Sequence, residues 1–261
     1  MQQPLLSSAD LHAEGDLPGH QVRGIAERIA SAISLGMLRV GERLPPEAEL
    51  ASQFGIAVAT LRKALAQLRA QGVVETRRGR NGGTFVVQAP FPSTETLIAA
   101  LHRIRVVQLR DFADEHAAVA GLAARLAAER VPPESRTRLA ELAFRAREAR
   151  GVQELSLTDS RFHVEVAVLS QSQRLLTSEQ RLQSEIGPLL WCDKTSRASA
   201  QQSFNDHLAL VMAIEQQQPA EAQRLAEEHA MRNVRDIVDA KLELQMLRND
   251  THGEDETGEA R

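Results

Sequence analysis

The order of helical and extended segments in the first third of the chain constrains its fold more than any other feature. Apolar residues recur every three or four positions over residues 22–33, which predicts an amphipathic helix. A short helix is predicted over residues 46–54, because proline is tolerated in a first helical turn. Gly55 then separates it from a longer helix predicted over residues 57–71.

The periodicity changes after Gly72. Residues 73–76 and 84–87 are rich in β-branched residues, and the segment between them is basic, rich in glycine and contains Asn-Gly. Two short strands around such a turn predict a β-hairpin. Helix, short helix, turn, helix and hairpin is the order of a winged helix-turn-helix, which we therefore predict over residues 19–89.

The remainder of the chain predicts helices only. Two prolines in residues 90–94 indicate a linker, and the sequence from 95 to 247 predicts an all-α bundle. The expected fold is thus mainly α, with one small hairpin. Residues 1–18 and 248–261 are polar and are expected to be disordered tails. The predicted helices lie near residues 95–130, 134–150, 153–170, 172–191, 197–217 and 219–247.

Composition excludes several classes of protein. The single cysteine, Cys192, excludes an intramolecular disulfide and fits a reducing compartment. The first residues lack the basic and apolar regions of a signal peptide, and no apolar run approaches the ~20 residues of a membrane span. We therefore expect a cytoplasmic protein without a membrane partner.

The charge is distributed unevenly along the chain. Residues 19–89 contain ten Lys and Arg against five Asp and Glu, whereas residues 93–247 contain nineteen against twenty-two. A basic first domain suits double-stranded DNA. The second helix of a helix-turn-helix enters the major groove, and the wing contacts phosphates or the minor groove. The candidate DNA-contacting residues are Thr60, Arg62 and Lys63 on that helix and Arg77, Arg78 and Arg80 in the wing. An isolated Arg62-Lys63 pair also fits a solvated helix face.

A second set of residues suggests a metal site. Asp159 and His163 are four residues apart, which places them on one face of a helix. With His207 and His229 they offer three imidazoles and one carboxylate, a ligand set for Zn²⁺ or another divalent transition ion. Spacing alone favours ordinary buried or exposed histidines over a metal site, because the chain has eight histidines.

The first domain resembles the DNA-binding domain of the GntR family of bacterial repressors. The resemblance rests on Leu44-Pro45-Pro46-Glu47, Phe54-Gly55-Ile56, Thr60-Leu61-Arg62-Lys63, Gly72-Val73-Val74-Glu75 and Gly82-Gly83-Thr84-Phe85-Val86. The chain departs from the common family pattern at Ala48, Ala57 and Val58, positions that usually contact DNA in the family. We therefore assign the family's DNA-contacting role only to Arg62 and the wing. We expect an operator sequence unlike the family's usual one.

The second domain resembles the FCD domain of the FadR subfamily. The resemblance rests on Asp159-x-x-Phe162-His163 and on His207 and His229 with the residues around them. It implies that Asp159, His163, His207 and His229 bind a divalent metal, with zinc foremost and nickel or manganese as alternatives, which helps to hold a small carboxylate effector. Arg110 matches an arginine common early in the domain and is the candidate partner of the effector carboxylate, or else a surface arginine. Ser172 departs from the family's usual asparagine. We assign no role to His102, His116, Trp191 or Cys192.

The expected mechanism follows from two-fold symmetry. We expect a homodimer to bind a pseudo-palindromic operator. Effector binding is expected to alter the relative pose of its DNA-binding domains. The expected effect on transcription is repression. One alternative is a metal-dependent hydrolase or lyase, although Glu165 has the wrong helical phase to serve as its base. A third reading is a regulator whose metal is purely structural.

Overall fold

The computed structural model describes residues 17–80, 82–130, 137–191 and 197–258. These residues form two compact units, the first ending at Pro92 and the second beginning at Ser93. Most of the predicted tail 1–18, Asn81 of the hairpin turn, the Pro132-Pro133 break and Cys192 lie outside the described residues.

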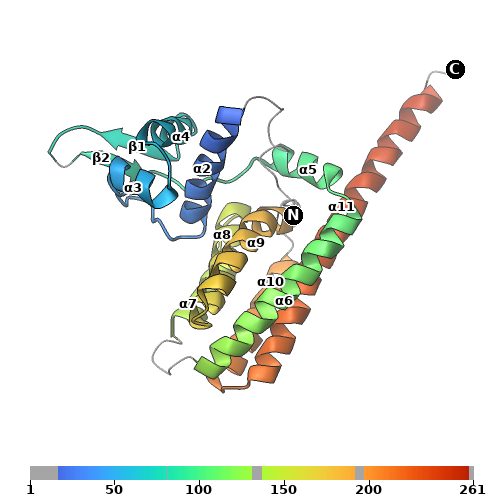
Figure 1. Ribbon diagram of the computed structural model, residues 1–261. Coiled ribbons are helices and arrows are strands. Elements are labelled where there is room, and N and C mark those ends of the chain that lie inside the picture. The colour runs from blue at the N-terminus through green and yellow to red at the C-terminus, as the bar shows by residue number, and fades with distance from the viewer. Residues whose placement is uncertain (1–16, 81, 131–136, 192–196, 259–261) are drawn as a thin grey trace. The chain divides into compact units, whose positions relative to one another are not determined.

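The first unit has the order of elements that the sequence predicted (Figure 1). Gly55 ends its second helix in the left-handed conformation, at φ 66° and ψ 37°, which a residue without a Cβ adopts at little cost. The chain then turns directly into the next helix, whose N-cap, Ala57, offers no side-chain hydrogen bond. The elements are α2 (Leu17–Ser34), α3 (Glu47–Phe54), α4 (Val58–Ala70), β1 (Val74–Arg77) and β2 (Gly83–Val86).

The hairpin pairs its two strands antiparallel, with Val74 opposite Val86 and Arg77 opposite Gly83. Arg43 adds an isolated bridge to Phe85, which ties the segment before α3 to the wing. A Cβ on Gly83 would lie 2.5 Å from Nε of Arg43. Glycine at this position therefore permits the close approach.

Apolar residues of α2, α4 and the hairpin form the core of the first unit. Ile25, Ile29 and Ile33 of α2 are buried, as their helical spacing predicts. The inward-facing leucines predicted on α4 are buried as well: Leu61, Leu65 and Leu68.

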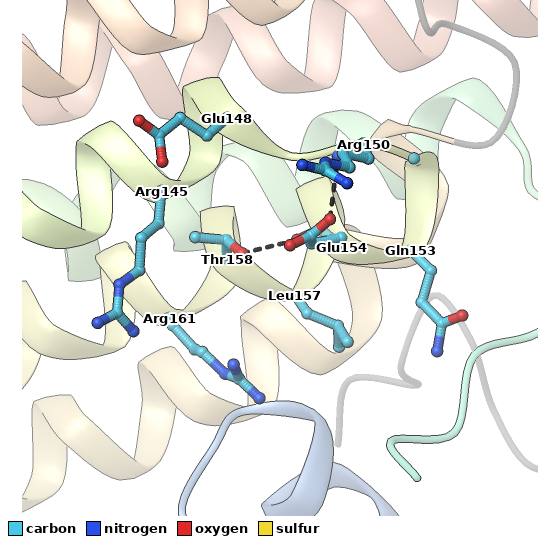
Figure 2. A pocket seen from close by; sticks show the side chains of 9 residues that line it. Arg145, Glu148, Arg150, Gln153, Glu154, Leu157, Thr158 and Arg161 are labelled. Atoms are coloured by element: carbon cyan, nitrogen blue, oxygen red, sulfur yellow. Dashed lines mark hydrogen bonds between the residues drawn. The ribbon is translucent and has the colours of Figure 1, made fainter.

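The described part of the second unit is entirely helical, as predicted. An open cavity lies between the end of α7 and the first half of α8 (Figure 2). Within the described chain, no helix is both long and apolar enough to span a membrane. The helices are α5 (Thr94–Arg103), α6 (Val106–Arg130), α7 (Thr137–Glu148), α8 (Val152–Leu169), α9 (Gln173–Leu190), α10 (Arg197–Glu215) and α11 (Pro219–Gly258).

Two of these helices differ from the prediction. The helix predicted over residues 95–130 is two helices, because Ile104 adopts an extended conformation, at φ −63° and ψ 129°, and buries its side chain. No glycine or proline marks this break, so the sequence contains no local signal for it. The last helix continues to Gly258, whereas its predicted end was residue 247.

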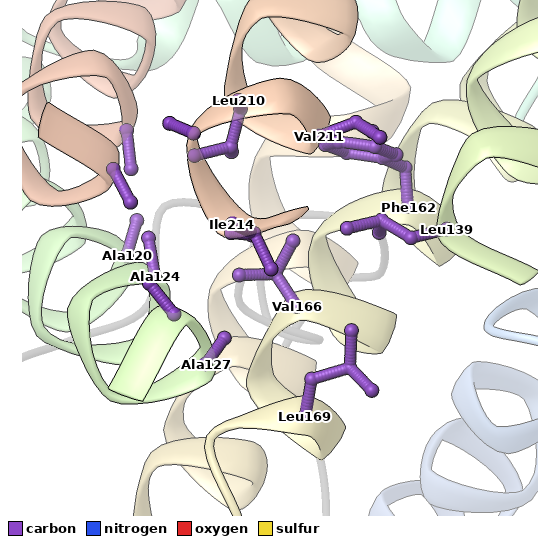
Figure 3. Close-up of a cluster of buried hydrophobic side chains, with 14 of the residues drawn as sticks. Ala120, Ala124, Ala127, Leu139, Phe162, Val166, Leu169, Leu210, Val211 and Ile214 are labelled. Carbon is purple, nitrogen blue, oxygen red and sulfur yellow. The ribbon is translucent and has the colours of Figure 1, made fainter. Parts of the chain in front are cut away.

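Small residues form the seam between α6 and α11. Ala120, Ala124 and Ala127 of α6 are buried in the main core cluster together with Phe162, Val166 and Ile214 (Figure 3). A Cβ on Gly121 would lie 2.5 Å from Cγ of Glu227 on α11. These small side chains let the backbones of α6 and α11 approach closely, and the packed helices provide a rigid frame for the polar residues described next.

Candidate metal centre

The four predicted metal ligands come from three helices of the second unit. Asp159 and His163 lie one turn apart on α8, His207 lies on α10 and His229 on α11. All four side chains are buried, with relative exposures between 1% and 6%. Burial of three imidazoles and a carboxylate carries a large desolvation cost unless they have partners.

The ligand atoms of the histidines converge. One ligand nitrogen from each of His163, His207 and His229 lies within 4.8 Å of the other two. Nε2 of His163 and Nε2 of His207 are 3.3 Å apart. The carboxylate of Asp159 lies 3.6 Å from Nε2 of His207 and 4.0 Å from Nε2 of His163. The structure thus brings all four predicted residues to one place.

These distances fit a single transition ion. Two imidazole nitrogens that bind one tetrahedral zinc at about 2.0–2.1 Å lie about 3.4 Å apart. The 3.3 Å between the His163 and His207 nitrogens matches that value. Among the described residues, Nδ1 of His207 is buried without a hydrogen-bond partner, so only the neighbours of Nε2 influence the tautomer of this ring. The donor set, three imidazoles and a carboxylate, is one that zinc and nickel accept.

His229 is held in the orientation that a ligand requires. Its Nδ1 lies 3.0 Å from a carboxylate oxygen of Asp206, which favours the tautomer with hydrogen on Nδ1. Nε2 then keeps its lone pair. It accepts a hydrogen bond from Nδ2 of Asn233 at 3.1 Å, which an ion at Nε2 would replace.

Burial sets the ionisation of the cluster. Burial lowers the pKa of His163 and of His207 well below the ordinary value, with the other imidazoles acting in the same direction. It also lowers the pKa of His229 to about 4, although Asp159 opposes this shift. Burial raises the pKa of Asp159, against hydrogen bonding by Ser203. The imidazoles are therefore neutral at pH 7, the form that binds a metal.

A second buried polar group, which the sequence analysis overlooked, adjoins the cluster. His116 on α6 is fully buried, and its ring centroid lies 6.3 Å from that of His163. Its Nε2 lies 3.3 Å from both Glu179 and Gln183 of α9, whose side chains are also buried. The sequence carried one usable signal, since His116 falls on the apolar face of α6 between Phe112 and Ala120.

Arg110, the candidate effector ligand, is exposed on α6, whereas the histidine cluster is buried. Its proposed contact with an effector stays a prediction. Glu165 points away from the cluster, as its helical phase indicated, and its carboxylate lies 3.2 Å from Nε of Arg138. Ser172, the departure from the family pattern, caps α9 by accepting a hydrogen bond from the Leu175 N–H.

The candidate DNA-contacting residues lie on the surface of the first unit. Thr60 is half-buried near the start of α4, and Arg62 and Lys63 are exposed beside it. Arg62 forms an ion pair, because its Nε lies 2.7 Å from the Glu47 carboxylate of α3. Among the described residues, Lys63 makes no ion pair.

The three wing arginines are exposed but differ in their contacts. Arg77 pairs with Glu75 at 2.7 Å, and its guanidinium lies 4.3 Å from the centroid of the Phe85 ring. Arg78 and Arg80 have no ion-pair partner within the described chain. Their charges are therefore the ones available to a polyanion.

Comparison with known proteins gives two family matches. Residues 21–86 match the gntR family of bacterial regulatory proteins, and residues 98–232 match the FCD domain. The chain is 47% identical over 222 residues to the HTH-type transcriptional regulator RmpR of Mycobacterium gastri, covering 84% of this chain and 81% of the relative. It is 29% identical over 231 residues to the Glc operon transcriptional activator of Escherichia coli K12, covering 84% and 89%. Among solved structures, Escherichia coli McbR/YncC shares the fold, with a TM-score of 0.51 at 18% identity over 84% of this chain and 98% of the other.

Proposed function

The chain belongs to the gntR family of DNA-binding transcriptional regulators and carries an FCD effector domain, and from this premise we propose that a divalent metal held by Asp159, His163, His207 and His229 binds a small carboxylate effector. The observation that carries the proposal is the convergence of three neutral, buried imidazole nitrogens within 4.8 Å of one another. A buried polar cluster of this kind is expensive without a partner. When bound, the ion supplies open coordination positions for a carboxylate oxygen.

Polar side chains around the cluster support a role beyond structure. Ser203 donates to Asp159 at 3.0 Å, and Asp206 and Asn233 contact His229. A small cavity of about 20 Å³ is lined by Ser203, Asp206 and Asn233, together with Trp191 and Arg232. A cavity of that size holds roughly one water molecule. An effector that reaches the ion by this route must displace the Arg232 side chain, which pairs with Asp206.

The proposed DNA contacts are Thr60, Arg62 and Lys63 of α4 and the wing residues Arg77, Arg78 and Arg80. The exposure of the five basic side chains supports this assignment. Ala57 is exposed at the start of α4, where an apolar side chain suits a thymine methyl group. The proposed assembly is a homodimer on a pseudo-palindromic operator, with repression as the proposed sign of regulation.

The first test is elemental analysis of the purified chain beside the variant Asp159→Ala/His163→Ala/His207→Ala/His229→Ala. We expect about one zinc, nickel or manganese ion per chain in the parent and none in the folded variant. A parent that lacks metal and takes up none of these ions would overturn the metal site. The matched control is His102→Ala/His252→Ala, which removes two histidines that are not proposed ligands.

The second test separates effector binding from a purely structural metal. Small carboxylates are screened by the thermal shift of the metal-loaded parent, because a ligand of the folded state raises Tm by mass action. We expect at least one carboxylate to raise Tm and to change operator binding in the parent but not in the metal-site variant. A metal-loaded protein that responds to none leaves the metal with a structural role. A carboxylate that raises transcription from the operator supports the proposal that the protein is a repressor. One that lowers transcription contradicts it.

A further inference from the structure

A second cavity of the second unit is lined by none of the proposed metal ligands. It is open, measures about 1110 Å³ and lies between α7 and α8 (Figure 2). The lining is polar and includes three arginines: Arg145, Glu148, Arg150, Gly151, Gln153, Glu154, Leu157, Thr158 and Arg161.

Arg161 is the most unusual of these residues. It lies on α8 between Asp159 and His163 in the sequence, yet it lines this cavity instead of the metal centre. Its side chain is half-buried, and its Nε is fully buried without a hydrogen-bond partner among the described residues. A guanidinium in this situation lacks an acceptor for a strong donor.

A second arginine that lines the cavity carries the same charge as Arg161. Arg145 extends from α7 to the same side of the cavity as Arg161 (Figure 2). Burial lowers the pKa of Arg161, and the charge of Arg145 lowers it further, as expected of two cations that repel each other. Arginine nevertheless remains charged in proteins, so the repulsion persists at neutral pH.

Elsewhere between α7 and α8, an arginine is neutralised by a carboxylate. Arg138 of α7 meets Glu165 of α8, with Nε and Oε2 3.2 Å apart. One turn earlier on α8, Arg161 lines the cavity together with Arg145 of α7. The two helices thus carry one ion pair between them and, in the cavity lining, two arginines of like charge.

The carboxylates of the cavity do not neutralise Arg161. Glu154 accepts a hydrogen bond from the backbone N–H of Arg150 at 3.0 Å, on the side away from Arg161 (Figure 2). Glu148 has no ion-pair partner within the described chain. Its charge opposes an anion in the cavity, which makes Glu148 a useful position for a test.

Within the described chain, neither Arg145 nor Arg161 has an ion-pair partner. From these two guanidinium groups and the open cavity, we infer that Arg145 and Arg161 bind a phosphate group, free or carried by a small metabolite. A tetrahedral oxyanion offers acceptors to two guanidinium groups at once and removes their repulsion. The site is separate from the proposed carboxylate effector. It lies on the opposite face of the helix that carries Asp159 and His163.

The experiment measures binding of inorganic pyrophosphate and of inorganic phosphate by titration calorimetry at low salt. The full-length chain is used with His207→Ala, so that a metal ion cannot hold the anion. We expect saturable binding, weakened about tenfold or more by Arg161→Gln and by Arg145→Gln. Glu148→Gln is expected to tighten it, because it removes a repelling charge.

Arg147→Gln is the matched control, because Arg147 lies on the same helix but over the Phe204 ring and outside the cavity. It removes the same charge and should change the dissociation constant less than twofold to threefold. Equal weakening by Arg147→Gln, or binding that survives both Arg145→Gln and Arg161→Gln, overturns the inference. So does an absence of binding to both probes. Phosphate binding without pyrophosphate binding favours a single phosphate group over a diphosphate.

Discussion

The wing and the candidate metal centre use polar side chains in opposite ways. Arg77, Arg78 and Arg80 come from one four-residue segment and are exposed. The proposed metal ligands come from three helices and are almost completely buried. Exposed charges attract phosphates over several ångströms through solvent, so their effect tolerates small displacements of the side chains. Buried ligands act through fixed distances in a dry site. Variants of the two regions should therefore have different signatures.

The largest effect is expected at the metal centre from a residue that is not itself a ligand. Asp206→Asn removes the carboxylate that orients His229, and we expect metal affinity to fall by about 10-fold to 100-fold. Competition with a chromophoric chelator measures the change. Asp111→Asn, an exposed change on α6, is the control and should have no effect. An unchanged affinity in Asp206→Asn would show that packing alone orients His229.

The second effect concerns pH and the metal-free protein. The folded-state pKa values of the three histidines lie below the unfolded value, and that of His229 is about 4. The unfolded chain therefore binds more protons below pH 6.5, and stability falls as pH falls. Between pH 7 and pH 5 we expect a loss of about 2 kcal/mol for a single such histidine.

Asp159 opposes this trend, because its raised pKa favours the folded state as pH falls. Three histidines outweigh one carboxyl group. Urea unfolding of the chelator-treated protein at both pH values measures the difference. The variant His163→Gln/His207→Gln/His229→Gln should lose less stability over the same range. An equal loss in this variant would assign the pH dependence to groups elsewhere.

The third effect is expected in the wing. Arg78→Ala/Arg80→Ala should weaken operator binding about tenfold and reduce the salt dependence by about one to two units of slope. Metal content should not change. Arg174→Ala/Arg235→Ala removes the same charge from exposed positions of the second unit and serves as the control. Binding that weakens with an unchanged salt slope would mean that the wing does not contact phosphates.

The smallest effect tests the ion pair that restrains Arg62. Glu47→Gln frees this arginine and should raise operator affinity about twofold to threefold, because exposed ion pairs contribute about 0–1 kcal/mol. Glu49→Gln removes the same charge from α3 without touching Arg62. Filter binding or fluorescence anisotropy is precise enough to distinguish the operator affinities of the two variants. Equal gains in both variants would indicate net charge as the cause.

The first unit could be predicted closely because its signals are local. Helical spacing located the buried residues of α2 and α4, and Gly55 marked the turn between α3 and α4. By contrast, the break at Ile104 has no local signal, since no glycine or proline accompanies the extended conformation and buried side chain of this residue. The ion-pair partner of Arg62, Glu47 of α3, likewise depends on a neighbouring element.

The sequence by itself determined the classes of element, the order of the two domains and, through resemblance, four candidate ligands. It could not determine that His116, Glu179 and Gln183 form a buried polar group beside His163, or that Asp206 orients His229. It also could not place Arg161 and Arg145 in the lining of one cavity. Hydrogen-bond patterns within a helix or hairpin depend on residues a few positions apart, so periodicity reveals them. Contacts between helices depend on rotation and crossing angle, which are set by packing of the whole bundle and only the tertiary structure decides.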